Sequence, residues 1–121
     1  MIKLVTPMKR RAGMSVSAFR EYYENHHRLI GEKYLKGFAT KYIRRFTTPL
    51  PDRSGKLIDP EYDVFLEIWY PDQETLRACV ASANHPDIQR EIREDEERLF
   101  DMTCMRSYLI DEFESDMVLP I

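Results

Sequence analysis

The sequence predicts an α+β fold in which a small sheet is covered by helices on one face. Three observations support this prediction. Residues 14–30 show the 3.6-residue period of an amphipathic helix, and residues 62–70 show the pattern of a strand. Segments of these two kinds follow one another in the order β–α–β, a long loop, and β–α–α–β. At 121 residues, 43% of them hydrophobic, the chain is predicted to form one domain over residues 1–121 with a single core.

Charge and composition exclude several classes of partner. The formal net charge of −3 leaves no basic field to hold nucleic acid, and no apolar run approaches the roughly 20 residues of a membrane-spanning helix. The N-terminal stretch lacks the order of a signal peptide, and Cys79 and Cys104 are too isolated to indicate a disulfide framework. We therefore expect a cytoplasmic protein with no nucleic-acid or membrane partner and with free thiols.

The first predicted elements are a strand and a long helix. The strand covers Ile2–Lys9, where Pro7 indicates a sheet edge or a bulge. The helix covers Met14–Ile30, and Ser15 is its predicted N-cap because a serine hydroxyl accepts from an amide of the first turn. Gly31 ends this helix, or the helix continues for another turn or two beyond it.

Two further strands are predicted on either side of a long loop. Phe38–Thr48 forms the first of them, and Tyr62–Tyr70 forms the second; Pro49–Pro60 between them is a loop by composition. The two faces of Tyr62–Tyr70 are both largely apolar, so both are expected to be covered. Because helices in so short a chain cover one face only, a second copy of the chain is predicted to cover the other, which gives a homodimer.

The C-terminal half is predicted to hold two helices and a last strand. Asp72 caps the first helix, and Pro86 stands at the start of the second. That second helix has a thin apolar stripe in a charged background, which favours a solvated face. The last strand covers Thr103–Phe113, and residues 115–121 form a tail. The complete order matches the ferredoxin-like split βαβ arrangement.

Three histidines are candidate acid–base groups. His26 shares the apolar stripe of the first helix, and His27 lies at its edge; this stripe also includes Phe19, Tyr23 and Ile30. His85 stands in the break before the last helix. The alternatives are structural histidines on the helix and an exposed loop residue at His85. A metal site is not expected, because the paired histidines are adjacent rather than four apart and lack a close acidic companion.

Aromatic and cationic side chains are candidates for binding a substrate. Tyr42 and Tyr70 are predicted to face one pocket, with Tyr23 above them from the helix, although ordinary core tyrosines explain the same pattern. Arg44 shares a strand face with Tyr42 and could bind a carboxylate in a bidentate pair, or lie on the surface. The remaining candidates are Trp69 and Tyr108. No glycine-rich phosphate loop, nucleotide fingerprint or serine-hydrolase motif is present, so no cofactor is expected.

Three segments together resemble one family. KRRAGMSVSAFREYYENHH at 9–27, YDVFLEIWYPD at 62–72 and DEERLFDMTCMRSYLIDE at 95–112 are similar to the corresponding segments of EthD-type proteins. The resemblance implies a dimeric α+β barrel, in which two ferredoxin-like sheets pack face to face. It places the family histidine at position 27, and so ranks His27 above His26. Arg28 and Leu29 depart from the small residue and proline that often follow that histidine, which would change the shape of the pocket.

Within this superfamily the sequence looks most like small fungal proteins of aromatic polyketide pathways. This likeness implies a cofactor-independent lyase that decarboxylates or dehydrates a hydroxylated β-keto acid. A histidine would act as general acid or base, and tyrosine or arginine donors would stabilise the developing oxyanion. The alternatives are a polyketide cyclase, a cofactor-free anthrone monooxygenase and a non-catalytic protein that binds an aromatic metabolite.

Overall fold

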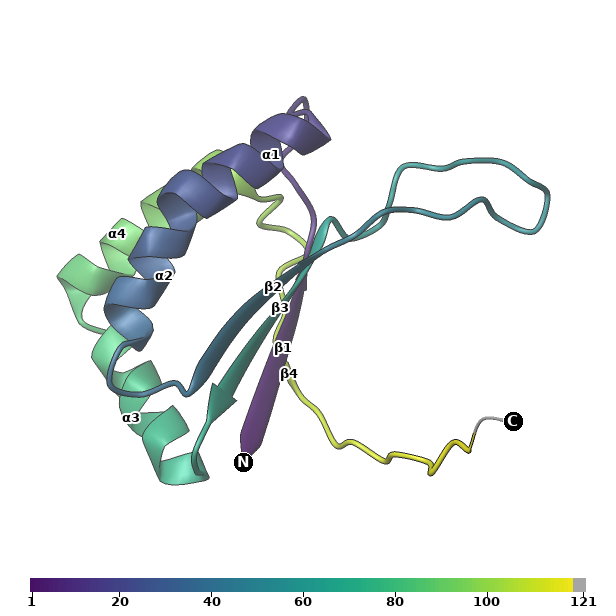
Figure 1. Ribbon diagram of the computed structural model, residues 1–121. Coiled ribbons are helices and arrows are strands. Elements are labelled where there is room, and N and C mark those ends of the chain that lie inside the picture. Colours follow the sequence, from purple (N-terminus) through teal and green to yellow (C-terminus); the bar gives the residue numbers. More distant parts are fainter. Residues whose placement is uncertain (119–121) are drawn as a thin grey trace.

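A four-stranded antiparallel sheet with all of its helices on one face forms the protein (Figure 1). The computed structural model describes residues 1–118. The strand order is β2-β3-β1-β4, as in a ferredoxin-like βαββαβ domain, and the predicted fold is therefore confirmed. The elements are β1 (Ile2–Met8), α1 (Val16–Tyr22), the π-helix η1 (Tyr23–His27), α2 (Arg28–Leu35), β2 (Lys41–Phe46), β3 (Val64–Tyr70), α3 (Gln73–Ala83), α4 (Pro86–Leu99) and β4 (Tyr108–Leu109).

The first helix is continuous from α1 through η1 to α2, and it passes Gly31 to end at Leu35. The Ser15 hydroxyl accepts from the amide of Ala18 at 3.1 Å, which confirms the predicted N-cap. The π turn at Tyr23–His27 holds an extra residue, so the buried face of the helix shifts. In consequence His27, and not His26, lies on the buried face.

The two long central strands present one face to the helices. Tyr42 of β2 and Leu4 of β1 both pair with Ile68 of β3, so the three residues form one row across the sheet. The predicted alternation of β3 is confirmed, since Val64, Ile68 and Tyr70 are all buried beneath the helices. The strand β2 is shorter than the predicted Phe38–Thr48, but its faces are as expected.

An aromatic cluster fills the core between the sheet and the helices. Phe19 and Tyr23 have no exposed surface, and their rings meet edge to face with centroids 6.1 Å apart. Both rings also lie against Phe46 of β2 and against Phe100, which follows α4. This packing fixes the π turn directly above the sheet.

The helices α3 and α4 begin where the sequence predicts. Asp72 caps α3 by accepting from the amide of Thr75 at 2.7 Å, and Pro86 is the first residue of α4. The prediction that the charged residues of α4 form a solvated face is wrong at Asp95. Asp95 is 1% exposed, because it faces the first helix, where it meets polar side chains.

The last strand is much shorter than the predicted Thr103–Phe113. Only Tyr108 and Leu109 pair with β1. The chain turns at residues 102–104, where the Asp101 carboxylate accepts from the amide of Thr103, and it is irregular at 105–107. The tail predicted at 115–121 is exposed and irregular as far as residue 118, and residues 119–121 lie outside the described part. No helix in residues 1–118 is long and apolar enough to cross a membrane.

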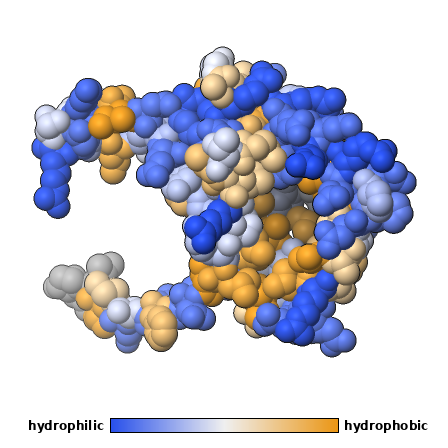
Figure 2. All heavy atoms as spheres, turned by 180° about the vertical axis from the view of Figure 1, so that it is seen from behind, coloured by the Kyte–Doolittle hydropathy of each residue, from blue (hydrophilic) through white to orange (hydrophobic). Residues whose placement is uncertain are grey.

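Two segments project from the sheet on the side opposite the helices: the loop 47–61 and the chain after β4 (Figure 1). Figure 2 shows them as two separate arms. Both carry large apolar side chains in solvent, with Leu57 65% exposed and Phe113 98% exposed. The outer face of the sheet therefore has a protruding segment on each side.

Candidate active site

A cavity of about 210 Å³ lies between the helices and the sheet. Its walls are mostly apolar, with a few polar atoms on different elements, as in sites for small organic molecules. The lining residues are His27, Ile30, Gly31, Tyr34, Leu35, Tyr42, Leu66, Ile68, Tyr70, Cys79, Val80, Ala83 and Ile92. Of the residues predicted from the sequence, His27, Tyr42 and Tyr70 thus meet at one cavity.

His27 is held by a buried carboxylate. Its Nδ1 atom lies 2.7 Å from Oδ2 of Asp95, which comes from α4. The Nε2 atom of His27 has no hydrogen-bond partner in residues 1–118, and it is not sealed from solvent. Because His27 lines the cavity, this second nitrogen is the one available to a bound molecule. A histidine whose other nitrogen is fixed by a carboxylate has a defined tautomer and ring orientation.

The Asp95 carboxylate also contacts three side chains that do not line the cavity. The Tyr22 hydroxyl donates to Oδ1, the Nδ1 atom of His26 lies 3.1 Å from the same oxygen, and Arg98 approaches it at 3.6 Å. The side chain of His26 is 53% exposed, whereas that of His27 is 10% exposed. Both predicted helix histidines therefore contact one carboxylate, but only His27 reaches the cavity.

The protonation states follow from burial and from these contacts. Burial lowers the pKa of His27 below its ordinary value, and this effect outweighs the Asp95 carboxylate, which acts to raise it. Burial acts to raise the pKa of Asp95, but hydrogen bonds from Tyr22 and His27 outweigh burial, and the pKa is lowered. At neutral pH we therefore assign a carboxylate to Asp95 and a neutral imidazole to His27, with the proton on Nδ1. The free Nε2 lone pair is then a base in the cavity wall.

Tyr42 stands in the cavity opposite the turn that follows His27. A Cβ atom added to Gly31 would lie 2.5 Å from the Tyr42 hydroxyl oxygen, so only glycine leaves room for this ring. Burial raises the pKa of Tyr42, which keeps its hydroxyl protonated as a hydrogen-bond donor. Tyr23 is fully buried in the core and does not line the cavity itself.

Tyr70 provides a second hydroxyl on the sheet. It donates to the sulfur of Cys79 at 3.7 Å, and burial raises the pKa of both groups. Both side chains are therefore neutral at physiological pH. The cavity accordingly holds a base from the helix layer and two tyrosine hydroxyls from the strands.

Besides His26 and Tyr23, four other predicted candidates do not line the cavity. Arg44 is held by the Glu24 carboxylate through two contacts of 2.9 Å, and so already has the bidentate partner that a substrate carboxylate would supply. Trp69 lies on the outer face of the sheet, where its ring nitrogen donates to Glu67. His85 is exposed and caps α4 through the amide of Asp87 at 3.2 Å.

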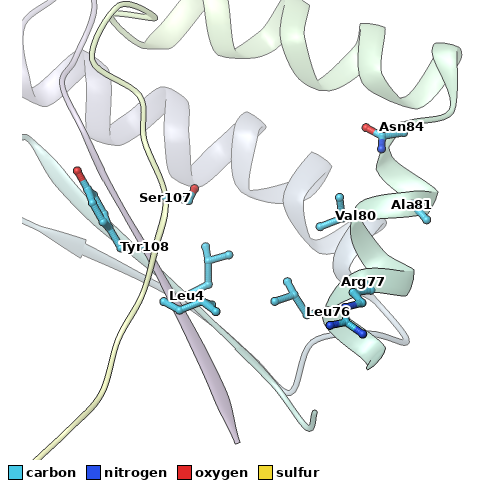
Figure 3. A pocket seen from close by; sticks show the side chains of 9 residues that line it. Leu4, Leu76, Arg77, Val80, Ala81, Asn84, Ser107 and Tyr108 are labelled. Atoms are coloured by element: carbon cyan, nitrogen blue, oxygen red, sulfur yellow. The ribbon is translucent and has the colours of Figure 1, made fainter. Parts of the chain in front are cut away.

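Tyr108, the fourth, lines a groove next to the cavity. This groove has a volume of about 420 Å³ and runs between α3 and the β4 region. Figure 3 shows Leu4, Leu76 and Val80 around it, and Val80 also belongs to the wall of the cavity. The molecule is visibly hollowed, with hydrophobic residues in the recess (Figure 2). The groove thus extends the apolar surface beyond the cavity.

Sequence reasoning missed Asp95. A signal was present, because Asp95 continues the spacing of the apolar stripe on α4: Ile88, Ile92, Asp95 and Leu99. A charged residue in register with an apolar stripe is buried, and buried charges have partners. In residues 1–118 no group of three or more histidine, cysteine, aspartate or glutamate side chains is arranged to hold a metal ion.

The fold and the cavity define a small ferredoxin-like α+β domain with the features of a small-molecule site. The model of the EthD domain matches residues 11–103, and the chain belongs to this family. No protein of curated function matches the sequence.

Solved structures share the fold of this chain. An EthD family protein from Bacillus halodurans superposes with a TM-score of 0.62 at 18% identity, over 93% of this chain and 99% of that one. HapK from Hahella chejuensis superposes with a TM-score of 0.58 at 9% identity, over 99% of this chain and 100% of that one. A putative antibiotic biosynthesis monooxygenase from Deinococcus radiodurans superposes with a TM-score of 0.51 at 10% identity, over 99% of this chain and 100% of that one. At such identities these likenesses concern the fold.

Proposed function

We propose that this protein is a cofactor-independent lyase for an aromatic polyketide intermediate, with His27 as its acid–base group. One observation carries the proposal. Asp95 occupies Nδ1 of His27 at 2.7 Å, which leaves Nε2 as the basic atom of that ring without a partner, and His27 lines the cavity. General acid–base catalysis by such a group contributes about 10²–10⁴-fold to a rate. Asp95 is then a positioning residue for His27.

The lowered pKa of His27 favours dehydration as the reaction. Neutral Nε2 takes the acidic proton next to the substrate carbonyl, and the electrons of the broken C–H bond pass to the carbonyl oxygen. The resulting enolate re-forms the carbonyl and expels the β-hydroxyl group. That group leaves as water with the proton returned by the imidazolium, so His27 ends as it began. Decarboxylation is the second candidate, and it requires His27 to start protonated, which burial opposes.

The walls of the cavity support an aromatic substrate. Leu66 and Ile68 form an apolar floor of the cavity on the sheet, and Tyr42 and Tyr70 line the same cavity. A planar polyphenol offers an apolar face to the floor and oxygens to the hydroxyls. At about 210 Å³ the cavity is below the usual ~300–1,000 Å³ of ligand sites, so we propose that a larger substrate also uses the groove lined by Val80.

We further propose that two copies pair through the outer face of the sheet. Phe65 is 36% exposed there and Trp69 lies on the same face. The arms on both sides of this face carry exposed apolar side chains, including Leu57 and Phe113. A second copy would cover the face and contact both arms, which removes apolar surface from water.

The reaction can be tested by mass spectrometry. The purified protein is incubated in anaerobic buffer with aromatic β-hydroxy ketones and β-keto acids, and the products are separated by liquid chromatography. The proposal predicts loss of water, or of carbon dioxide for decarboxylation, and the loss of this turnover in His27→Ala. Glu94→Gln is the matched control, because Glu94 precedes Asp95 on α4 but is exposed. If all substrates remain intact although they bind, the chain is a binding protein.

A cofactor-free monooxygenase is the second candidate function. The same Nε2 base would form a substrate carbanion, which then reacts with O2. Structures described as antibiotic biosynthesis monooxygenases share the fold, which is why this reaction is worth testing. Product that gains oxygen only in air would favour this candidate over the lyase.

A further inference from the structure

The Asp95 carboxylate is shared between two imidazoles, one in the cavity wall and one at the surface. Its Oδ2 atom lies 2.7 Å from Nδ1 of His27, and its Oδ1 atom lies 3.1 Å from Nδ1 of His26. The side chain of Asp95 is 1% exposed, whereas that of His26 is 53% exposed. The proposed reaction uses His27 and Asp95 but gives His26 no role. A buried carboxylate therefore connects the candidate base to a titratable group in contact with solvent.

The ring of His26 is held beside this carboxylate. Tyr22 stands four residues before it, and the two rings lie with centroids 4.9 Å apart and an angle of 30° between their planes. The Tyr22 hydroxyl donates to the same Oδ1 atom of Asp95 that His26 approaches. The π turn contains both histidines, and it places them at the two oxygens of one carboxylate. The position of His26 is thus fixed by its neighbours.

Other titratable and charged groups surround the two histidines. Those near His26 are Glu21 and Tyr22 of α1 and Asp87, Arg90, Glu91, Glu94 and Arg98 of α4. Those near His27 are Tyr23, which meets its ring, and Tyr34, Tyr42, Tyr70 and Cys79, which line the same cavity. Carboxylates and guanidinium groups keep their charge at neutral pH, and tyrosine and cysteine are uncharged there. Histidine is the residue type whose charge changes between pH 5 and 8.

Two imidazoles that share one carboxylate do not take up protons independently. The first proton favours His26, because water hydrates an imidazolium at the surface while burial opposes one at His27. Once charged, His26 balances the charge of Asp95 and repels a second positive charge on His27. Burial is accordingly the main cause of the lowered pKa of His27, and the charge of His26 adds to the lowering.

We propose that His26 is a positioning residue that takes up the proton in place of His27 when the pH falls, and so keeps the Nε2 atom of His27 free as a base. Charged His26 would pair with Asp95 across the 3.1 Å contact, so the buried carboxylate keeps a partner of opposite charge. This inference deepens the proposed function and rests on it for the reaction, but its main test measures protonation and needs no turnover.

The test is a titration of the histidines by nuclear magnetic resonance. The chain has three histidines, and substituting each in turn assigns its ring C–H signal. As the pH is lowered, the signal of His26 should change before that of His27. In His26→Gln the titration midpoint of His27 should rise by about half a pH unit or more, the effect of removing one nearby charge. A midpoint that stays or falls, or His27 changing first, would overturn the inference.

Two controls separate charge from shape. His26→Lys keeps the positive charge without the imidazole, so the midpoint of His27 should stay at or below the wild-type value. If His26→Lys raises the midpoint as much as His26→Gln does, the charge of His26 is not what matters and the inference is overturned. His85, which is exposed and caps α4, provides the reference signal, and its midpoint should not change in either variant.

The pH dependence of turnover connects the titration to the reaction. With a substrate that reacts, the acidic limb of kcat/KM for His26→Gln should move up by the same amount as the midpoint of His27. The rate then falls about threefold relative to the wild type in acid and stays within about twofold of it at pH 8. If the midpoint of His27 moves but no substrate turns over, the lyase is rejected and the shared carboxylate stands.

Discussion

The Nδ1 atom of His27 lies 2.7 Å from Oδ2 of Asp95, although the two residues belong to different helices and are 68 positions apart in the sequence. This contact joins the π turn of the first helix to α4 directly above the sheet. It also separates the two adjacent histidines by role, because His27 faces the cavity while His26 contacts the same carboxylate from the surface.

The first prediction concerns this contact. Asp95→Asn keeps the shape of the side chain but removes the charge, and its amide favours the wrong tautomer of His27. We expect turnover to fall by about 10²–10⁴-fold, the range that general acid–base catalysis contributes. The steady-state rate of Asp95→Asn measures this fall in turnover, with Glu94→Gln as the control. A rate within twofold of the wild type would show that His27 does not depend on this carboxylate.

The second prediction is a loss of stability in acid that depends on His27. Its pKa is lowered by burial from the ordinary value of 6.5, so the unfolded chain binds more protons than the native one. The contribution of neutral, buried His27 to the free energy of unfolding is present above pH 6.5 and decreases as the pH falls below this value. Urea unfolding of the wild type and of His27→Gln at several pH values measures this. The free-energy difference between the two proteins should shrink toward acid; a constant difference would contradict the prediction.

Glu96 is predicted to act in the opposite direction. Burial raises its pKa from 4.5 to about 7, so the native state favours the protonated acid. The contribution of protonated Glu96 to the free energy of unfolding is present below pH 4.5 and is lost as the pH rises through about 7. At pH 8 the neutral Glu96→Gln should exceed the wild type in free energy of unfolding by about 1–2 kcal/mol. At pH 4 the two proteins should be nearly equal, and an equal gain at both pH values would point to another cause.

Gly31→Ala is predicted to damage the cavity without breaking the helix. The new Cβ atom would lie 2.5 Å from the Tyr42 hydroxyl oxygen, so the ring must move. We expect at least tenfold weaker binding of an aromatic ligand by titration calorimetry, the loss of about one hydrogen bond.

The background without the Tyr42 ring provides the matching control. In Tyr42→Ala the same Gly31→Ala change meets no ring and should stabilise the protein by up to about 1 kcal/mol, the difference in helix propensity. If Gly31→Ala has the same effect on stability in both backgrounds, the close approach to Tyr42 is not what requires glycine.

Pairing through the outer face gives the last prediction. Phe65→Asp places a charge on that face, and it should convert a dimer into a monomer in sedimentation velocity experiments. Leu29→Asp is the matched control, because Leu29 is 52% exposed on the helix layer. A monomeric wild type, or a dimer that survives Phe65→Asp, would contradict pairing through this face.

The positions of most helices and strands could be predicted because their signals are local. The N-caps Ser15 and Asp72 and the helix start at Pro86 each act within one turn, and all three are confirmed. The alternation of β3 likewise needs only neighbouring residues. The last strand was predicted too long, since its extent depends on β1, which meets only Tyr108 and Leu109.

The candidate site was predictable only in part. The sequence by itself determined the ferredoxin-like order and the presence of histidines and tyrosines on the inner faces. Tertiary structure decided which of them meet, because the π turn shifts the helix face toward His27 and packing of α4 brings Asp95 against it. Which side chains meet depends on contacts between segments that are distant in the sequence. One extra residue in a helical turn redirects a side chain, and the local periodicity of the sequence does not reveal it.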